Sequence, residues 1–144
     1  MNTETTKNKE KLNEKDEYRL TFSYSQEQVN KFAEVTGDNN PLHLDEEYAA
    51  TTMFKRPIMH GFLGGSVFSK IFGTLFPGEG TIYMNQTMNF MRPMFVDTEY
   101  EAVMTITEIT REKNRAKVQT QVIDKTTGKV TISGEATVIN ANRL

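Results

Sequence analysis

HGFLGGSVFSKIFGTLF, residues 60–76, decides the fold of this 144-residue chain. Nearly every large side chain in this stretch is apolar, and Lys70 is its only charged residue. A helix that is apolar almost all round is a central, buried helix. The polar residues His60, Ser66 and Ser69, together with four glycines, argue against a membrane span. The stretch therefore predicts a long, buried helix over about residues 60–76.

After this helix, apolar residues recur at every second position, which is typical of β-strands. We expect strands at about 81–91, 98–112, 115–124 and 129–140, separated by turns at Arg92-Pro93, Lys113-Asn114 and Thr126-Thr127-Gly128. A run of strands that follows one apolar helix predicts an α+β fold, with an antiparallel sheet curled around that helix.

Before the helix, residues 18–24 alternate apolar and polar side chains, which predicts a half-buried strand. A helix over 26–36 follows, because Ser25 and Gln28 form the pattern of a capping box and Gly37 ends it. The next residues, Asp38-Asn39-Asn40-Pro41, predict a loop. Asp45 then caps a short helix over about 46–50.

The overall composition narrows the class of protein. The net charge of −2 gives no basic patch for a nucleic-acid partner, and the absence of cysteine excludes disulfides and thiolate chemistry. Residues 1–17 are polar with mixed charges, so we expect a flexible tail, followed by a single domain over 18–144. The tail contains no apolar run, so we expect no secretory signal and a cytoplasmic protein.

Asp38 and His43 are the first candidates for chemistry, since a carboxylate and an imidazole make a natural acid–base pair. Five residues of separation bring them together neither on a helix nor on a strand, but a tight turn through residues 39–41 allows it. Alternatively, Asp38 is a turn-forming residue and His43 is a structural histidine.

The start of the long helix offers a second kind of site. Backbone N–H groups there have no partner within the helix, so Gly61 can donate to a developing oxyanion. Close helix–sheet packing explains the glycines equally well. Ser69 lies about two turns further along, where a lone serine commonly bonds its own helix backbone. Lys55, Arg56 and Arg92 are candidates to meet phosphates, although such residues are often only solvated.

Taken together, Phe32-Ala-Glu-Val-Thr-Gly-Asp-Asn-Asn-Pro-Leu-His-Leu-Asp45, with Ala49-Ala50-Thr51-Thr52 and Arg56-Pro-Ile-Met-His-Gly61, resembles the MaoC-like hydratases, and most of all the (R)-specific enoyl-CoA hydratases. The Gly-Asp-x-Asn-Pro-Leu-His core matches the hydratase signature of the family. The resemblance covers about residues 21–138 and is strongest over 32–69. Val96 stands where the family often has glycine.

The resemblance implies a hot-dog fold, in which the curved sheet wraps the long helix, and a homodimer with the acyl chain near the subunit interface. It also implies that Asp38 and His43 activate a water that adds to a trans-2-enoyl thioester, which gives an (R)-3-hydroxyacyl thioester. By position, Ser69 matches a serine that bonds the catalytic carboxylate, and Gly61 matches the oxyanion donor. We also take four residues as substrate-binding candidates: Asn40, Arg56, His60 and Arg92.

The resemblance implies neither a metal nor a redox cofactor, because coenzyme A or acyl-carrier pantetheine is part of the substrate. Two other functions are weighed against hydration. A hot-dog thioesterase directs water at the carbonyl carbon, and a non-catalytic module only binds the acyl thioester. The signature argues against the first, and an intact acid–base pair argues against the second.

Overall fold

The computed structural model describes residues 10–144, in which one strand and four helices precede the remaining strands. The elements are β1 (Glu17–Phe22), α2 (Gln26–Thr36), α3 (Pro41–Leu44), α4 (Glu46–Ala50), α5 (Gly61–Thr74), β2 (Ile82–Gln86), β3 (Asn89–Phe90), β4 (Tyr100–Thr110), the 3-10 turn η1 (Arg111–Lys113), β5 (Arg115–Asp124) and β6 (Val130–Ile139).

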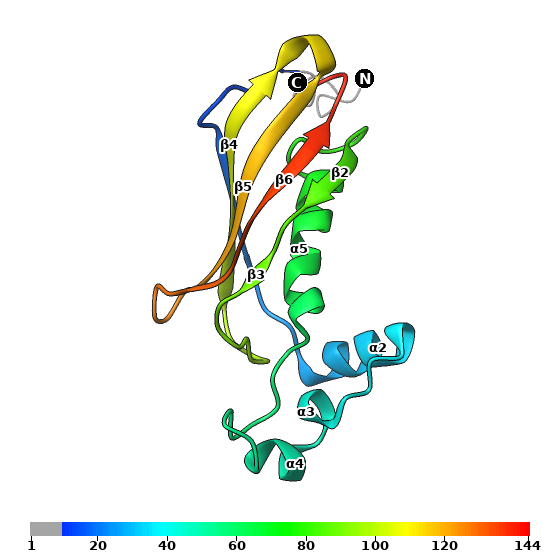
Figure 1. The fold of residues 1–144 in the computed structure, drawn as a ribbon, viewed down its shortest axis with the longest axis vertical. Helices are drawn as coiled ribbons and strands as arrows, with labels where there is room; N and C mark the ends of the chain where they lie inside the picture. The colour runs from blue at the N-terminus through cyan, green and yellow to red at the C-terminus, as the bar shows by residue number, and fades with distance from the viewer. Residues whose placement is uncertain (1–9) are drawn as a thin grey trace, which may run out of the picture.

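The strands form one antiparallel sheet in the order β1-β4-β5-β6-β2, and β3 pairs with β6 beyond the end of β2. The long helix α5 runs along one face of this sheet (Figure 1). The predicted α+β arrangement of an antiparallel sheet around one buried helix is confirmed. Strand β2 pairs on one side only, so it forms an edge of the sheet.

The hydrophobic core lies between α5 and the sheet. On β5, burial alternates strictly over Ala116–Val122, so every second side chain points at the helix. Helix α5 contributes four fully buried side chains: Val67, Phe68, Ile71 and Phe72. Its observed end at Thr74 falls two residues before the predicted one, because the last turn widens there. The N–H groups of Leu75 and Phe76 share the Ile71 carbonyl, and the bond from Phe76 spans five residues.

The single strand predicted over 81–91 is wrong in one respect, since the structure divides it into β2 and β3. Between them, Thr87 leaves the ladder and its carbonyl oxygen lies against Gly134 of β6. The Thr87 N–H still donates to the Glu135 carbonyl at 2.8 Å. The alternation of apolar and polar residues predicts a strand, but the position of the break between β2 and β3 depends on how the chain pairs with β6.

Helices α2, α3 and α4 lie beyond one end of the sheet, next to the start of α5 (Figure 1). The capping box at Ser25 is confirmed, and Gly37 ends α2 with a left-handed φ of 80°. The predicted loop after Gly37 is shorter than expected, because α3 begins at Pro41. Asn40 caps this helical turn, and proline suits the first helical position.

The flexible tail predicted over residues 1–17 is wrong for residues 10–17, since β1 already begins at Glu17 and the residues before it bond to the rest of the domain. Leu12 is 7% exposed and joins the core, and its N–H donates to the Arg143 carbonyl at 2.8 Å. The Lys15 N–H donates to the Ile106 carbonyl at 2.7 Å. Further bonds hold the segment, among them the Ile106 N–H to the Asp16 carbonyl at 2.9 Å and Arg111 Nη2 to the Leu12 carbonyl at 2.6 Å. Residues 1–9 lie outside the described part of the chain, and the single domain over 18–144 stays a prediction.

None of the helices within residues 10–144 combines the length and the apolar character of a membrane span.

Candidate active site

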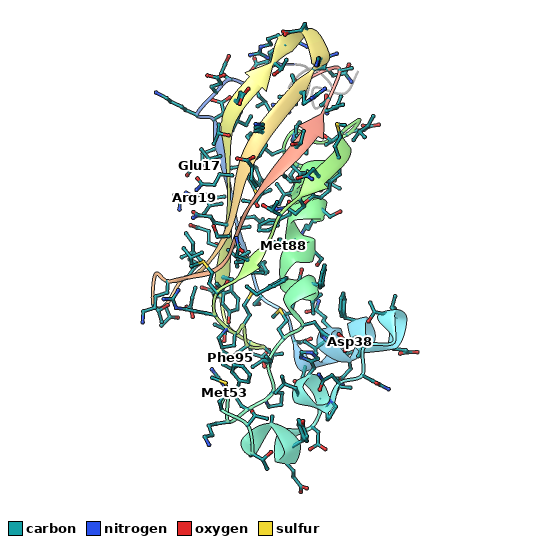
Figure 2. The ribbon with its side chains drawn as sticks, viewed as in Figure 1. Glu17, Arg19, Asp38, Met53, Met88 and Phe95 are labelled. Atoms are coloured by element: carbon teal, nitrogen blue, oxygen red, sulfur yellow. The ribbon has the colours of Figure 1, made fainter. Side chains whose placement is uncertain are left out.

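Asp38, His43 and His60 meet where the α2–α4 segment joins α5. Their side-chain donor atoms all lie within 4.8 Å of one another, and no other group of three His, Asp or Glu residues within 10–144 is this close. Figure 2 shows Asp38 near the start of α5. Two imidazoles and a carboxylate are also a donor set that divalent transition metals accept. The cluster is therefore the place where a water or a cation would be held.

Local chain geometry brings Asp38 and His43 together. The left-handed Gly37 turns the chain out of α2, and the Asn40 side chain accepts the Leu42 N–H at 3.0 Å to start α3. His43 therefore folds back toward Asp38 across the intervening residues. The tight turn through residues 39–41, which was needed to bring Asp38 and His43 together, is therefore present.

One ring nitrogen of His43 is held by the backbone. Its Nδ1 lies 2.8 Å from the Ile58 carbonyl oxygen. A carbonyl only accepts, so the hydrogen bond places the proton of the neutral ring on Nδ1. Nε2 is then free to accept a proton from a bound water.

Asp38 is exposed and lightly held. The Asn40 N–H approaches its Oδ1 at 3.5 Å, which is a long contact, and the carboxylate forms no ion pair within residues 10–144. The carboxylate therefore keeps its capacity to accept a proton or a hydrogen bond.

Asp38 lines a cavity of about 700 Å³ that lies between α5 and β2. Ser69 lines the same cavity, and its hydroxyl makes no hydrogen bond with any of residues 10–144, so it does not bond its own helix backbone. Tyr83 lines the far wall, where its hydroxyl bonds Gln86 and burial raises its pKa to about 12. The cavity thus has one polar end and otherwise mostly apolar or uncharged walls.

A second cavity, of about 510 Å³, begins at Gly61 and is lined mainly by methionine and aromatic side chains. Phe62 borders both cavities. The Gly61 N–H finds no acceptor within the described chain, and α5 has no side-chain cap. A β-carbon at Gly61 would lie 2.7 Å from the Phe90 ring, so glycine permits this close approach. Gly61 therefore carries a free N–H donor and lines the second cavity.

The predicted substrate-binding residues fall into two groups. The Asn40 oxygen is used in capping α3, and His60 is 3% exposed with its Nε2 against the Asp38 carbonyl, so neither side chain lines a cavity. Both side chains are engaged by the protein's own backbone, and their predicted contact with substrate stays a prediction. Arg92 lines the second cavity and donates to the Val130 carbonyl at 2.8 Å, and Arg56 lies 3.7 Å above the Phe95 ring.

Sequence reasoning missed the residues that separate and close the cavities. Phe62 was assigned to the core, yet it is 68% exposed between the two cavities. Tyr83 and Met88, on and just after β2, were assigned only to a strand, yet they form a cavity wall. The apolar residues of strand β2 were the signal from which a cavity wall could have been predicted. Which of them face α5 depends on the bulge in β2.

The family described as MaoC like domain matches residues 4–133. An (R)-specific enoyl-CoA hydratase of Aeromonas caviae is 40% identical over 120 residues, which are 83% of this chain and 89% of that protein. A protein of the same name from Rhodospirillum rubrum is 38% identical over 83% of this chain and 82% of its own length. The solved (R)-hydratase of A. caviae superposes with a TM-score of 0.86 at 38% identity and covers 90% of this chain and 97% of its own. These likenesses confirm the predicted hot-dog fold.

Proposed function

Because this chain belongs to the family of MaoC-like domains, we propose that it catalyses the reversible hydration of trans-2-enoyl thioesters to (R)-3-hydroxyacyl thioesters. It is a hydro-lyase, and the same site dehydrates the 3-hydroxyacyl thioester when that is in excess. The observation that carries the proposal is the pair Asp38 and His43, whose free acceptor atoms converge beside a large cavity.

In the proposed reaction, Asp38 and His43 hold one water over the β-carbon. The Gly61 N–H and the positive end of the α5 dipole polarise the thioester carbonyl, which makes the β-carbon electrophilic. Asp38 accepts a proton as the hydroxyl oxygen bonds to the β-carbon, and the acid–base pair returns a proton to the α-carbon. The net change is one H and one OH across the double bond, so the chemistry requires neither metal nor redox cofactor.

Ser69 on α5 supports this assignment. Its hydroxyl makes no hydrogen bond within the described chain and lines the same cavity as Asp38, so it is available to donate to the carboxylate. Such a bond favours the carboxylate form and fixes its direction.

A coenzyme A thioester carries phosphate groups, and Arg56 and Arg92 are the candidates to bind them. Arg56 and Arg92 are held by an aromatic ring and a carbonyl, and neither forms an ion pair within the described chain. The charge of Arg92, which lines the second cavity, is therefore uncompensated there and suits the phosphates of coenzyme A. Arg56, over the Phe95 ring, adds a second uncompensated cation. An acidic acyl carrier protein would need a wider basic surface than two or three cations on a chain of net charge −2.

We further propose a homodimer that forms along β2. This edge strand exposes Ile82 and Met84, which are 60% and 53% exposed, and Phe62 lies nearby on α5. Unpaired edges with apolar side chains are commonly covered by another chain. A second copy would pair with β2 and close the cavity between α5 and β2. The cytoplasmic location stays a prediction.

The test compares the wild type with Asp38→Asn and with Asp97→Asn as a matched control. Asp97 is exposed with a left-handed φ of 53°, which asparagine tolerates. We expect the wild type to remove the enoyl absorbance of crotonyl-CoA and to form the (R) product. Asp38→Asn should fold normally and lose about 100-fold or more in rate, the usual contribution of an acid–base group. Near-normal turnover by Asp38→Asn would refute the mechanism.

Release of free thiol by the wild type, measured in the same assay, would instead identify a thioesterase. Binding of the thioester without either reaction would identify a binding module.

A further inference from the structure

We propose that His60 is a positioning residue that holds Asp38, His43 and Gly61 in their working arrangement; this inference rests on the proposed function. His60 is buried, with 3% of its surface exposed, and it precedes the first residue of α5. It contacts each of the three groups through a different part of its structure: the ring nitrogen, the ring face and the backbone.

The ring nitrogen anchors the loop that carries Asp38. His60 Nε2 lies 2.9 Å from the Asp38 carbonyl oxygen. The other hydrogen bonds of residues 38–40 found in the described chain are local and reach at most three residues along the sequence. The bond from His60 is therefore the one hydrogen bond that ties this loop to α5.

The ring face supports His43. The two imidazoles pack with centroids 3.8 Å apart and their planes tilted by 31°, and Phe32 packs on His60 with ring centroids 4.8 Å apart. The His43 ring is thus held by the Ile58 carbonyl at its Nδ1 and by the His60 ring on its face. Loss of the stack would leave one hydrogen bond about which the ring can swing.

The backbone of His60 sets the start of α5. Its carbonyl accepts the N–H groups of Leu63 and Gly64, both at 3.1 Å. The direction of the Gly61 N–H, one residue later, follows from this turn. A shift of His60 would therefore move the oxyanion donor relative to Asp38.

His60 has no path for proton transfer of its own. A carbonyl accepts at Nε2, so that nitrogen carries the hydrogen, and Nδ1 is buried without a partner within residues 10–144. His60 lines neither cavity. Its contribution to the rate therefore acts through the placement of Asp38 and His43.

The experiment compares two substitutions in the full-length protein. His60→Phe keeps an aromatic ring for the stack but loses the donor to the Asp38 carbonyl. His60→Gln keeps a donor near the position of Nε2 but loses the ring. We expect kcat for crotonyl-CoA to fall by about 10- to 100-fold in both, since a displacement of about 1 Å at a reacting group costs about that much, while KM stays near the wild-type value.

Val29→Ala is the structural control, because Val29 is a fully buried core residue outside the site. It should lower the melting temperature and leave kcat per folded molecule unchanged. The imidazole ¹⁵N signals of His43 give a second readout: the wild type should show one tautomer with the hydrogen on Nδ1, and His60→Phe a mixture of tautomers.

Several results would overturn the inference. One is a His60→Phe variant that folds and keeps at least half the wild-type kcat. If His60→Phe does not fold, a folded His60→Gln variant with at least half the wild-type kcat would overturn the inference instead. Another is a loss of kcat that only follows the loss of folded protein. A third is inactivation by a chelator with recovery on adding Zn²⁺, which would make the three side chains a metal site. An inactive wild type would refute the proposed function instead.

Discussion

Gly134→Ala tests the close approach of Thr87, in the connection between β2 and β3, to Gly134 of β6. A β-carbon at Gly134 would lie 1.7 Å from the Thr87 carbonyl oxygen and 2.7 Å from its carbonyl carbon. Real β-carbons essentially never approach closer than 3.0 Å, and the obstacle here is backbone, so the two strands must separate. Separation strains two hydrogen bonds, from the Thr87 N–H to the Glu135 carbonyl at 2.8 Å and from the Glu135 N–H to Thr87 Oγ1 at 3.0 Å.

Each of these bonds contributes about 1 kcal/mol, and forcing a methyl group into a packed site costs about 1–3 kcal/mol more. The expected loss of unfolding free energy is therefore about 3–5 kcal/mol, a large part of the usual total. For a domain of this size, this lowers the melting temperature by about 10 °C or more.

Thermal unfolding followed by circular dichroism measures the effect of Gly134→Ala. Gly73→Ala is the matched control, since Gly73 lies on the exposed side of α5 and, apart from the neighbouring backbone of the helix, nothing lies within 4 Å of the added β-carbon. It should stabilise the protein by up to about 1 kcal/mol, the difference in helix propensity. A melting temperature for Gly134→Ala at or above that of the wild type would refute this account of the β2–β3 crossing.

Three further predictions concern the edge strand, the phosphates and pH. Ile82→Lys should convert the proposed dimer to monomer in sedimentation velocity, since an edge lysine disfavours strand pairing; a dimer that persists in this variant would place the interface elsewhere. Arg92→Gln should raise KM for crotonyl-CoA by up to about 5-fold, the value of an exposed ion pair of about 1 kcal/mol, but leave KM for crotonyl-pantetheine unchanged. Burial raises the pKa of Tyr83 from 10.0 to about 12, so between those pH values the unfolded chain loses a proton that the folded protein keeps. Stability should fall across that range, and the fall should be smaller in Tyr83→Phe when both are measured by urea unfolding.

Much of the fold follows from local patterns. The nearly all-apolar helix and the period-two stretches after it gave the correct class, because helix and strand each have their own spacing of buried residues. The helix over Gln26–Thr36 was predicted to the residue, since Ser25 and Gly37 bond only with near neighbours in sequence. The break between β2 and β3 and the packing of Leu12 depend on distant partners, and for that reason they were mispredicted.

By itself, the sequence determined which residue types were available for chemistry. The order Gly-Asp-Asn-Asn-Pro-Leu-His fixes a turn between Asp38 and His43, because glycine, asparagine and proline restrict the backbone locally. Only the tertiary structure decided which residues surround Asp38 and His43. His60 lies 22 residues from Asp38 in sequence, and its bond to the Asp38 carbonyl and its stack on His43 exist because α5 begins at the end of the sheet where the α2–α4 segment returns. Sequence spacing carries no information about such a contact, since chain folding over the whole domain sets the distance between its partners.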